Sequence, residues 1–187
     1  MTTAAPARTN TWTIDPTHSI AEFAVKHLVV TTVKGRFRDL EGTIEIDEAQ
    51  PENSAVEAKI AVASVDTNVE DRDNHLRSDD FFNAERFPYL TFRSTRIERI
   101  DEERFKLVGD LTIRDVTKEV ALDGEYEGQI ADPWGNQRAA FTATTQISRK
   151  EFNIRYNQVL ETGGAVVGDN VKITLHLEAI RQKGEDA

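Results

Sequence analysis

Apolar and polar residues alternate with a period of two along most of the chain, which is the pattern of a half-buried β-strand. Near the N-terminus, for example, Phe23, Val25 and His27 share one face of a predicted strand, and Glu22 and Lys26 share the other. The alternation predicts about nine strands in all. They cover residues 11–14, 19–28, 33–47, 54–65, 88–95, 104–113, 118–128, 138–148 and 170–180.

The apolar phase changes within the segment 33–47. Phe37 belongs to one phase, whereas Leu40 and Ile44 belong to the other. A slip of one residue moves every later side chain to the opposite face unless the strand contains an extra residue. The pattern therefore predicts a β-bulge near Arg38–Asp39, of the kind that bends a sheet toward closure.

Short polar turns separate the predicted strands, and no helical pattern alternates with them. Consecutive strands are therefore expected to pair as antiparallel neighbours. So many amphipathic strands need a shared interior, and a closed barrel supplies one without leaving exposed edges. Ten residues of strand span roughly 33 Å, so a barrel of about eight strands has room for an elongated ligand. We predict an all-β domain over residues 11–181, with flexible tails at 1–10 and 182–187.

The segment 68–88 differs from the rest of the chain because it is dense in charge and contains a Phe-Phe pair. Asn68 is a candidate N-cap for a short helix over residues 69–77. The carboxylate spacing lacks the glycine and the twelfth-position glutamate of a calcium loop. We therefore predict no metal site but a helical insertion, in which Arg72 and Arg77 pair with aspartates.

The chain has 187 residues, a net charge of −10 and no cysteine. The acidic balance disfavours nucleic acid and anionic membrane surfaces as partners, because both attract basic proteins. Without cysteine there is no disulfide, thiolate nucleophile or zinc ribbon. No run of about 18 apolar residues occurs, so no membrane span is expected. The N-terminal MTTAAPARTN has no apolar region typical of a secretory signal, which favours a cytoplasmic location.

No sequence motif nominates a catalytic centre. The chain contains neither GxSxG nor SxxK, and its glycine-rich segment 161–170 lacks the order of a phosphate-binding loop. His27 lies on the apolar side of its strand. It would be either a satisfied interior group near the strand end or a hydrogen-bond donor to a ligand head. We predict neither enzymatic activity nor a cofactor.

Small residues recur on the predicted inner face of the sheet. Such residues fit either a solid core, in which large neighbours fill the space above them, or an internal cavity. They are Ala21, Gly35, Gly42, Ala58, Gly109, Gly124, Ala139, Ala143 and Ala179.

Several motifs between Trp12 and Glu178 occur in the order typical of one known family. They are IDPTHSIAEFAVKHL (14–28), VKGRFRDLEGTI (33–44), SVDTNVEDRDNHLRSDDFFNAERFPYLTF (64–92), VGDLTIRDVTKEV (108–120), ISRKEFNI (147–154) and VGDNVKITLHLE (167–178). On these residues the chain resembles the YceI-like family, the lipocalin-like polyisoprenoid-binding proteins. It departs from the family at Arg114-Asp115, where the family often has glycine, and it shows no signal peptide of the kind that some periplasmic members carry.

The resemblance implies a lipocalin-like, extended antiparallel barrel around a long isoprenoid chain, such as a polyprenyl diphosphate or a quinone tail, for transport, storage or sensing. An apolar tail in a preformed tunnel is bound through the area removed from water, so no catalytic residue is needed. The expected tail contacts are the inward residues Phe23, Val25, Phe37, Ile60, Phe92, Leu107, Leu111, Phe141 and Ile147, with Phe81 and Phe82 beside the short helix. The candidate donors to a charged head are His27, Arg72, His75, Arg77, Arg149 and Arg155.

Two alternatives to lipid binding stay open on the sequence. An enzyme acting on an isoprenoid or another apolar substrate in the same cavity would depend on one polar inner residue, for which His27 is the best candidate. A structural or interaction domain would instead have a solid core without a continuous void. The resemblance also makes a homodimer plausible, paired through an outer sheet face.

Overall fold

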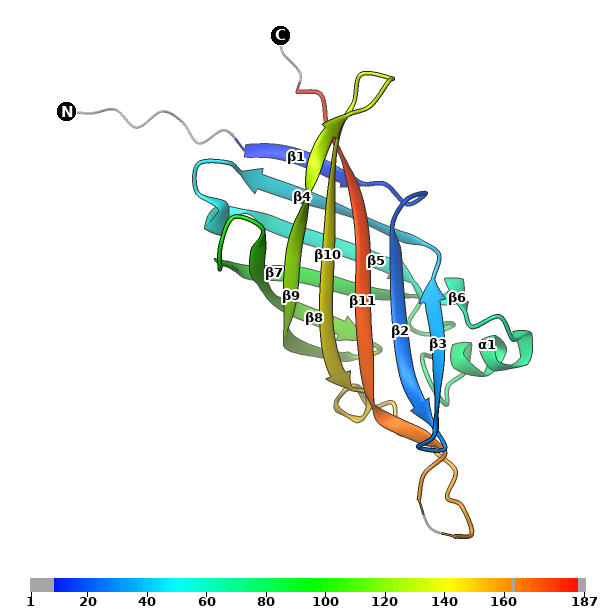
Figure 1. Cartoon of the computed structure of the whole chain (residues 1–187). Helices are drawn as coiled ribbons and strands as arrows, with labels where there is room; N and C mark the ends of the chain where they lie inside the picture. Colours follow the sequence, from blue (N-terminus) through cyan, green and yellow to red (C-terminus); the bar gives the residue numbers. More distant parts are fainter. Residues whose placement is uncertain (1–8, 163, 185–187) are drawn as a thin grey trace, which may run out of the picture.

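The computed structural model describes residues 9–162 and 164–184, which form a β-barrel with one α-helix (Figure 1). The predicted tails lie mostly outside the described residues. The strands are β1 (Thr9–Ile14), β2 (Ile20–His27), β3 (Thr31–Phe37), β4 (Leu40–Asp47), β5 (Ala55–Ala61), β6 (Val65–Asp66), β7 (Tyr89–Arg99), β8 (Arg104–Ile113), β9 (Val116–Ala131), β10 (Gln137–Ser148) and β11 (Val167–Arg181). The helix is α1 (Glu70–Arg77), and three short 3-10 turns are η1 (Pro51–Asn53), η2 (Val62–Ser64) and η3 (Arg149–Phe152).

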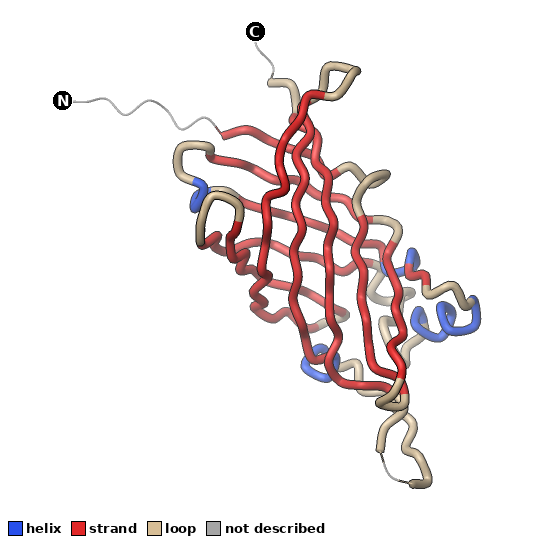
Figure 2. The backbone as a smooth tube through the Cα atoms, viewed as in Figure 1, coloured by secondary structure: helices blue, strands red, loops and turns tan. Residues whose placement is uncertain are grey.

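Eight strands close the barrel in the order β1-β4-β5-β7-β8-β9-β10-β11, because β11 pairs back with β1. Strands β2, β3 and β6 extend the sheet from the other end of β11. The pairings among the described strands are all antiparallel. Figure 2 shows the strands of the near wall crossing those of the far wall at a steep angle, as strongly tilted barrel strands do. The predicted closed antiparallel barrel of about eight strands is confirmed.

The predicted β-bulge at Arg38–Asp39 is wrong, although the phase slip is real. The strand breaks at this point, since β3 pairs with β2 and β6 whereas β4 pairs with β1 and β5. The backbone amides of Arg38 and Asp39 donate to the carbonyl and hydroxyl oxygens of Ser64 at 3.3 and 3.1 Å. A chain that changes partners at a corner also resets which face its side chains occupy, so the corner explains the slip.

Glycines on the inner face receive aromatic rings from the neighbouring strand. Phe23 pairs across the strands with Gly35, and Phe105 pairs with Gly124. A Cβ atom at either glycine would overlap the ring of its partner. At these positions the small residue leaves space that the ring of the neighbouring strand occupies, and the interdigitation expected of a solid core is present locally.

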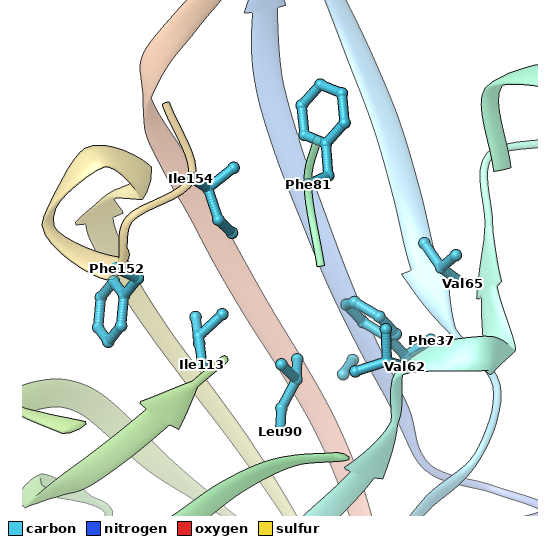
Figure 3. Close-up of a cluster of buried hydrophobic side chains, with 9 residues drawn as sticks. Phe37, Val62, Val65, Phe81, Leu90, Ile113, Phe152 and Ile154 are labelled. Atoms are coloured by element: carbon cyan, nitrogen blue, oxygen red, sulfur yellow. The ribbon is translucent and has the colours of Figure 1, made fainter. Parts of the chain in front are cut away.

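The largest buried cluster joins the helical insertion to the barrel (Figure 3). Phe81 from the insertion is 9% exposed, and Phe37, Leu90 and Ile113 belong to the same cluster. Phe82 packs edge-on against Phe37 with ring centroids 5.6 Å apart. Both phenylalanines of the insertion therefore turn inward.

Helix α1 is anchored in a different way from the one predicted. It begins at Glu70, and Asn68 does not cap it, because Val69 occupies the N-cap position and no side chain makes a capping bond there. Instead, Oδ1 of Asp73 inside the helix accepts bonds from the amide and hydroxyl of Thr67 at 2.8 and 2.6 Å. Helix α1 has eight residues, and among the described residues no helix has the length and apolar character needed to cross a bilayer.

The predicted pairs of Arg72 and Arg77 with aspartates are also wrong. Arg72 donates to the hydroxyl and the carbonyl of Thr67 at 2.8 and 2.9 Å. Arg77 donates to the carbonyls of Ala63 and Val65 at 2.9 and 3.1 Å. Both guanidinium groups therefore fasten α1 to the backbone of the segment that precedes it.

Arg138 holds the seam of the barrel together. It donates to Asp132 and Asp15 at 2.7 and 2.9 Å and also to Glu178, which brings the β9–β10 turn, the β1–β2 turn and β11 to one point. Burial by itself would raise the pKa values of Asp15 and Asp132, but hydrogen bonds to His18 and Arg138 outweigh it. Both carboxyl groups thus have pKa values well below their usual range and stay ionised.

Replacing Arg138 with Met should leave three carboxylates without their cation. Removing one partner of a largely buried ionic network typically costs about 3 kcal/mol, so we expect the free energy of unfolding to fall by about that amount. Urea denaturation would measure it. The matched control is Arg93→Met, because Arg93 pairs with Glu57 on the surface at 78% exposure and should cost less than about 1 kcal/mol. Equal costs for the two variants would contradict a special role for Arg138.

Candidate functional site

A cavity of about 850 Å³ lies inside the barrel. Each of the eight strands in the closed ring contributes lining residues, from Ile14 in β1 to Ile173 in β11. Inward residues in the middle of strands, such as Leu111 and Phe141, are only partly buried although they face the interior. They border unfilled space, so the core is not solid throughout.

The structure places every predicted tail-contact residue on the wall of this cavity. These are Phe23, Val25, Phe37, Ile60, Phe81, Phe82, Phe92, Leu107, Leu111, Phe141 and Ile147. They come from β2, β3, β5, β7, β8, β10 and the helical insertion. Strand alternation therefore identified the wall, and contact of these residues with a ligand stays a prediction.

The predicted head-group residues divide into two sets. His27, Arg72, His75 and Arg149 line the cavity, at the end where β2 meets β3 and α1 lies. Figure 1 shows α1 and the β2–β3 turn toward the same end of the barrel. Arg77 and Arg155 are not among the lining residues, and Arg155 is exposed. We refer to this end, with Lys26, His27, Arg72 and His75 on its wall, as the basic mouth.

Arg149 is a structural clamp, which makes it a poor donor to a ligand head. Its side chain is 4% exposed. Nε donates to the carbonyl of Gly168 at 2.8 Å, and Nη1 donates to those of Ile154 and Tyr156 at 2.9 and 2.8 Å. Nη2 donates to the carbonyl of Val167 at 3.3 Å. Burial lowers the pKa of Arg149, yet the four carbonyls favour its charged form, and they occupy its donors.

Alternation alone missed Lys26, which lines the cavity although its neighbours in the sequence predict an outward side chain. The β2–β3 ladder keeps its phase through Lys26, and Lys26 is exposed. It therefore borders the cavity as an outward residue at the end of β2, where Gly168 of β11 lies opposite it.

The opposite end of the cavity has a charged rim that the sequence interpretation also missed. It contains Glu48, Arg99, Asp101, Glu102, Glu103, Arg104 and Gln129. The backbone amide of Arg104 and its side chain hold the pKa of Asp101 at about 2, so this carboxylate is ionised at neutral pH. With four acids against two arginines, this acidic mouth would repel an anionic head group. The run of charges at 98–104 was its sequence signal.

Asp15, His18 and Glu178 lie close enough to ligate a metal ion, with ligand atoms within 4.8 Å of one another. Arg138, however, donates to both carboxylates. His18 is bonded to Asp15 at 2.9 Å, and this bond raises the pKa of His18. Arg138 thus supplies the positive charge that balances the carboxylates of Asp15 and Glu178. The three residues belong to the ionic network at the barrel seam.

The Arg149 clamp can be tested by Arg149→Met. Four carbonyls of the segment 154–168 would lose their donor, and we expect the free energy of unfolding to fall by about 3 kcal/mol. Hydrogen–deuterium exchange should become faster in this segment before the rest of the barrel changes. Arg155→Met, an exposed arginine in the same segment, serves as the control and should leave exchange unchanged. An equally slow exchange in Arg149→Met would refute the clamp.

Comparison with known proteins places this fold and cavity in context. A family model described as the YceI-like domain matches residues 12–179. The chain is 38% identical over 166 residues to Protein YceI of Escherichia coli O157:H7. The matched region covers 89% of this chain and 83% of that one.

Two solved structures have the same architecture. The YCEI protein of Campylobacter jejuni has a TM-score of 0.72 at 34% identity, covering 84% of this chain and 90% of that one. A polyisoprenoid binding domain from Saccharophagus degradans has a TM-score of 0.70 at 15% identity, covering 91% of this chain and 98% of that one. The first is a relative in sequence as well as in fold, whereas the second shares the fold alone.

Proposed function

The chain belongs to the YceI-like domain family, and from this premise we propose that it binds an isoprenoid lipid with the apolar tail inside the barrel. The observation that carries the proposal is the continuous apolar cavity lined by all eight strands of the ring. The structural neighbour from Saccharophagus degradans is named a polyisoprenoid binding domain, which supports this class of ligand. Burial of the tail would supply the binding free energy, at about 25 cal/mol per Å² before ordering costs.

The size of the cavity bounds the part of the ligand that it encloses. At about 30 Å³ for each water-sized group, the 850 Å³ cavity holds on the order of 28 carbon-sized groups, or about five to six isoprene units. A shorter tail would leave unfilled space, and a much longer one would extend from a mouth. This range suits a prenyl diphosphate or the prenyl tail of a quinone.

The charges at the two ends support one orientation of an anionic ligand. Lys26, His27 and Arg72 lie at the basic mouth, and the ammonium group of Lys26 there would stabilise a diphosphate. Asp101, with its lowered pKa, lies at the opposite mouth. We therefore propose that the tail points toward the acidic mouth and the head stays at the basic one.

We propose binding without turnover. His27, the best candidate for a catalytic group, has no side-chain hydrogen bond within the described residues. A general base is normally oriented by such a partner. An apolar wall with cations at one end needs no chemical step to hold an amphipathic lipid, so binding explains the site with fewer requirements.

The ligand can be identified by native mass spectrometry of the purified protein followed by organic extraction. We expect a bound mass that matches a prenyl lipid, or uptake of an added prenyl diphosphate or quinone. Leu175→Trp adds bulk to the cavity wall and should reduce occupancy about tenfold, because over-filling costs about 1 to 3 kcal/mol. His176→Trp adds the same bulk at the next, outward position of β11 and should bind normally. Wild-type protein that stays empty despite added prenyl lipid would disprove the proposal.

Phe82→Ala should weaken lipid retention while the barrel stays folded. Phe82 lines the cavity and is supported by Phe37, and loss of its ring from a ligand contact should reduce affinity about tenfold. Phe87→Ala is the matched control, because Phe87 stacks with Arg86 and does not line the cavity. Ligand dissociation rates would compare the variants, and equal rates would assign the insertion no part in binding.

A further inference from the structure

Four large apolar side chains are exposed at the basic mouth. Val29 and Val30 in the β2–β3 turn are 80% and 78% exposed, Val159 is 83% exposed, and Leu28 is 39% exposed. Fully exposed valines are ordinary when they are scattered, but a contiguous group marks an interaction surface. We call these four residues the apolar tip.

Backbone pairing brings the two segments of the tip together. His27 pairs with Val167, and the amide of Leu28 donates to the carbonyl of Val166 at 2.9 Å. Val159 in turn forms a bridge with Ala165. Figure 1 shows the β2–β3 turn and the loop before β11 projecting from the same end of the barrel. The tip therefore has a defined shape.

The backbone at the tip is unfavourable for the residues that it carries. Leu28 and Val29 have φ values of 51° and 63°, a conformation that hairpin turns usually give to Asn and Gly. A β-branched residue at positive φ is a strained exception. Asn would suit position 29 better in water, so the valine points to an environment that favours an apolar side chain.

The two segments that carry the tip differ in charge from the whole chain. The segments 25–34 and 155–167 contain Lys26, Lys34 and Arg155 and a single acid, Glu161, although the net charge of the chain is −10. Apolar side chains flanked by cations suit the interface of a bilayer that contains anionic lipids. The overall acidity therefore does not exclude membrane contact at this end.

The tip also lies directly beside the cavity. His27 and Val166, which adjoin Leu28 and Ala165 in the sequence, line the cavity. We propose that the apolar tip inserts into the interface of a lipid bilayer, so that the basic mouth faces the membrane and a prenyl tail enters without crossing water. The route of lipid entry rests on the proposed function, whereas membrane insertion of the tip stands without it.

The test is flotation of the whole protein with vesicles of phosphatidylethanolamine and phosphatidylglycerol. We expect the wild type to float with the vesicles, and Val29→Asn with Val30→Ser to reduce partitioning by about tenfold for each valine removed. Asn tolerates positive φ, so the double variant should fold at least as well as the wild type. Ile130→Asn with Trp134→Ser is the matched control, because these residues are 69% and 77% exposed in the β9–β10 hairpin away from the tip.

A second measurement locates the contact. The chain has no cysteine, so Val159→Cys and Ile130→Cys each give one labelling site for an environment-sensitive fluorophore. We expect a blue shift on vesicle addition at position 159 and none at 130. The proposal would be overturned if the tip variant floats like the wild type or if the hairpin variant loses as much vesicle binding as the tip variant. A fluorescence shift at position 130 alone would also overturn it.

Two controls distinguish membrane insertion of the tip from self-association of the chain and from prenyl-lipid binding in the cavity. Self-association of the wild type that is lost in the tip variant, without vesicle binding, would assign the tip to a second copy of the chain and overturn membrane insertion. The tip variant should still take up a prenyl lipid from detergent solution. If the wild type floats through its tip but takes up no prenyl lipid from any source, lipid binding fails and the membrane contact stands.

Discussion

The pairing of β1 with β11 is the constraint on which the rest of the structure depends. Only three residue pairs form it, with Ile14 opposite Ala179 at one end, yet these pairs convert an open sheet into a ring. An open sheet would expose two edges and the apolar wall between them. Arg138 lies beside this seam and binds carboxylates from three chain segments, so a local ionic network secures a closure that few backbone bonds make.

Closure explains how the barrel can be stable around unfilled space. In a solid core, a void of this size would cost many contacts. Here the walls are held by continuous backbone ladders and by rings that lie over glycines, as Phe23 does over Gly35 and Phe105 over Gly124. Dense packing is concentrated in clusters such as the one around Phe81 and Phe152. The scaffold is therefore formed before any ligand is present, which reduces the ordering cost of binding.

The sequence predicted the wall of the site better than its mouths. A period of two assigns each strand residue to one face. It placed Leu111 and Phe141 on the cavity correctly because the β8–β9 and β10–β11 ladders keep their phase. The same rule gave no indication of Lys26, an exposed residue of the outward phase that borders the cavity at the end of β2. It also led to the wrong prediction of a bulge at Arg38–Asp39, because a period-two pattern carries no information on which strand is the partner.

Irregular segments were the least predictable part, since their contacts depend on residues far away in the chain. Arg114 illustrates this point. It has a φ of 55°, and so occupies the conformation for which glycine is favoured, and its guanidinium donates to the carbonyls of Asp79 and Phe81 at 3.2 and 3.1 Å. Arg114 thus adopts the backbone conformation that the turn requires, and its side chain also holds the helical insertion against the barrel.

The arginines near the basic mouth follow one common rule. Arg72, Arg77, Arg114 and Arg149 all donate to backbone carbonyls, most of which lie in turns and loops outside the strands. Buried carbonyls must be paired, and a planar guanidinium can satisfy several at once. The count of cations at this end therefore overstates the charge available to a ligand. Lys26 and His27, which make no side-chain bond within the described residues, become the stronger candidates for meeting a head group as it enters.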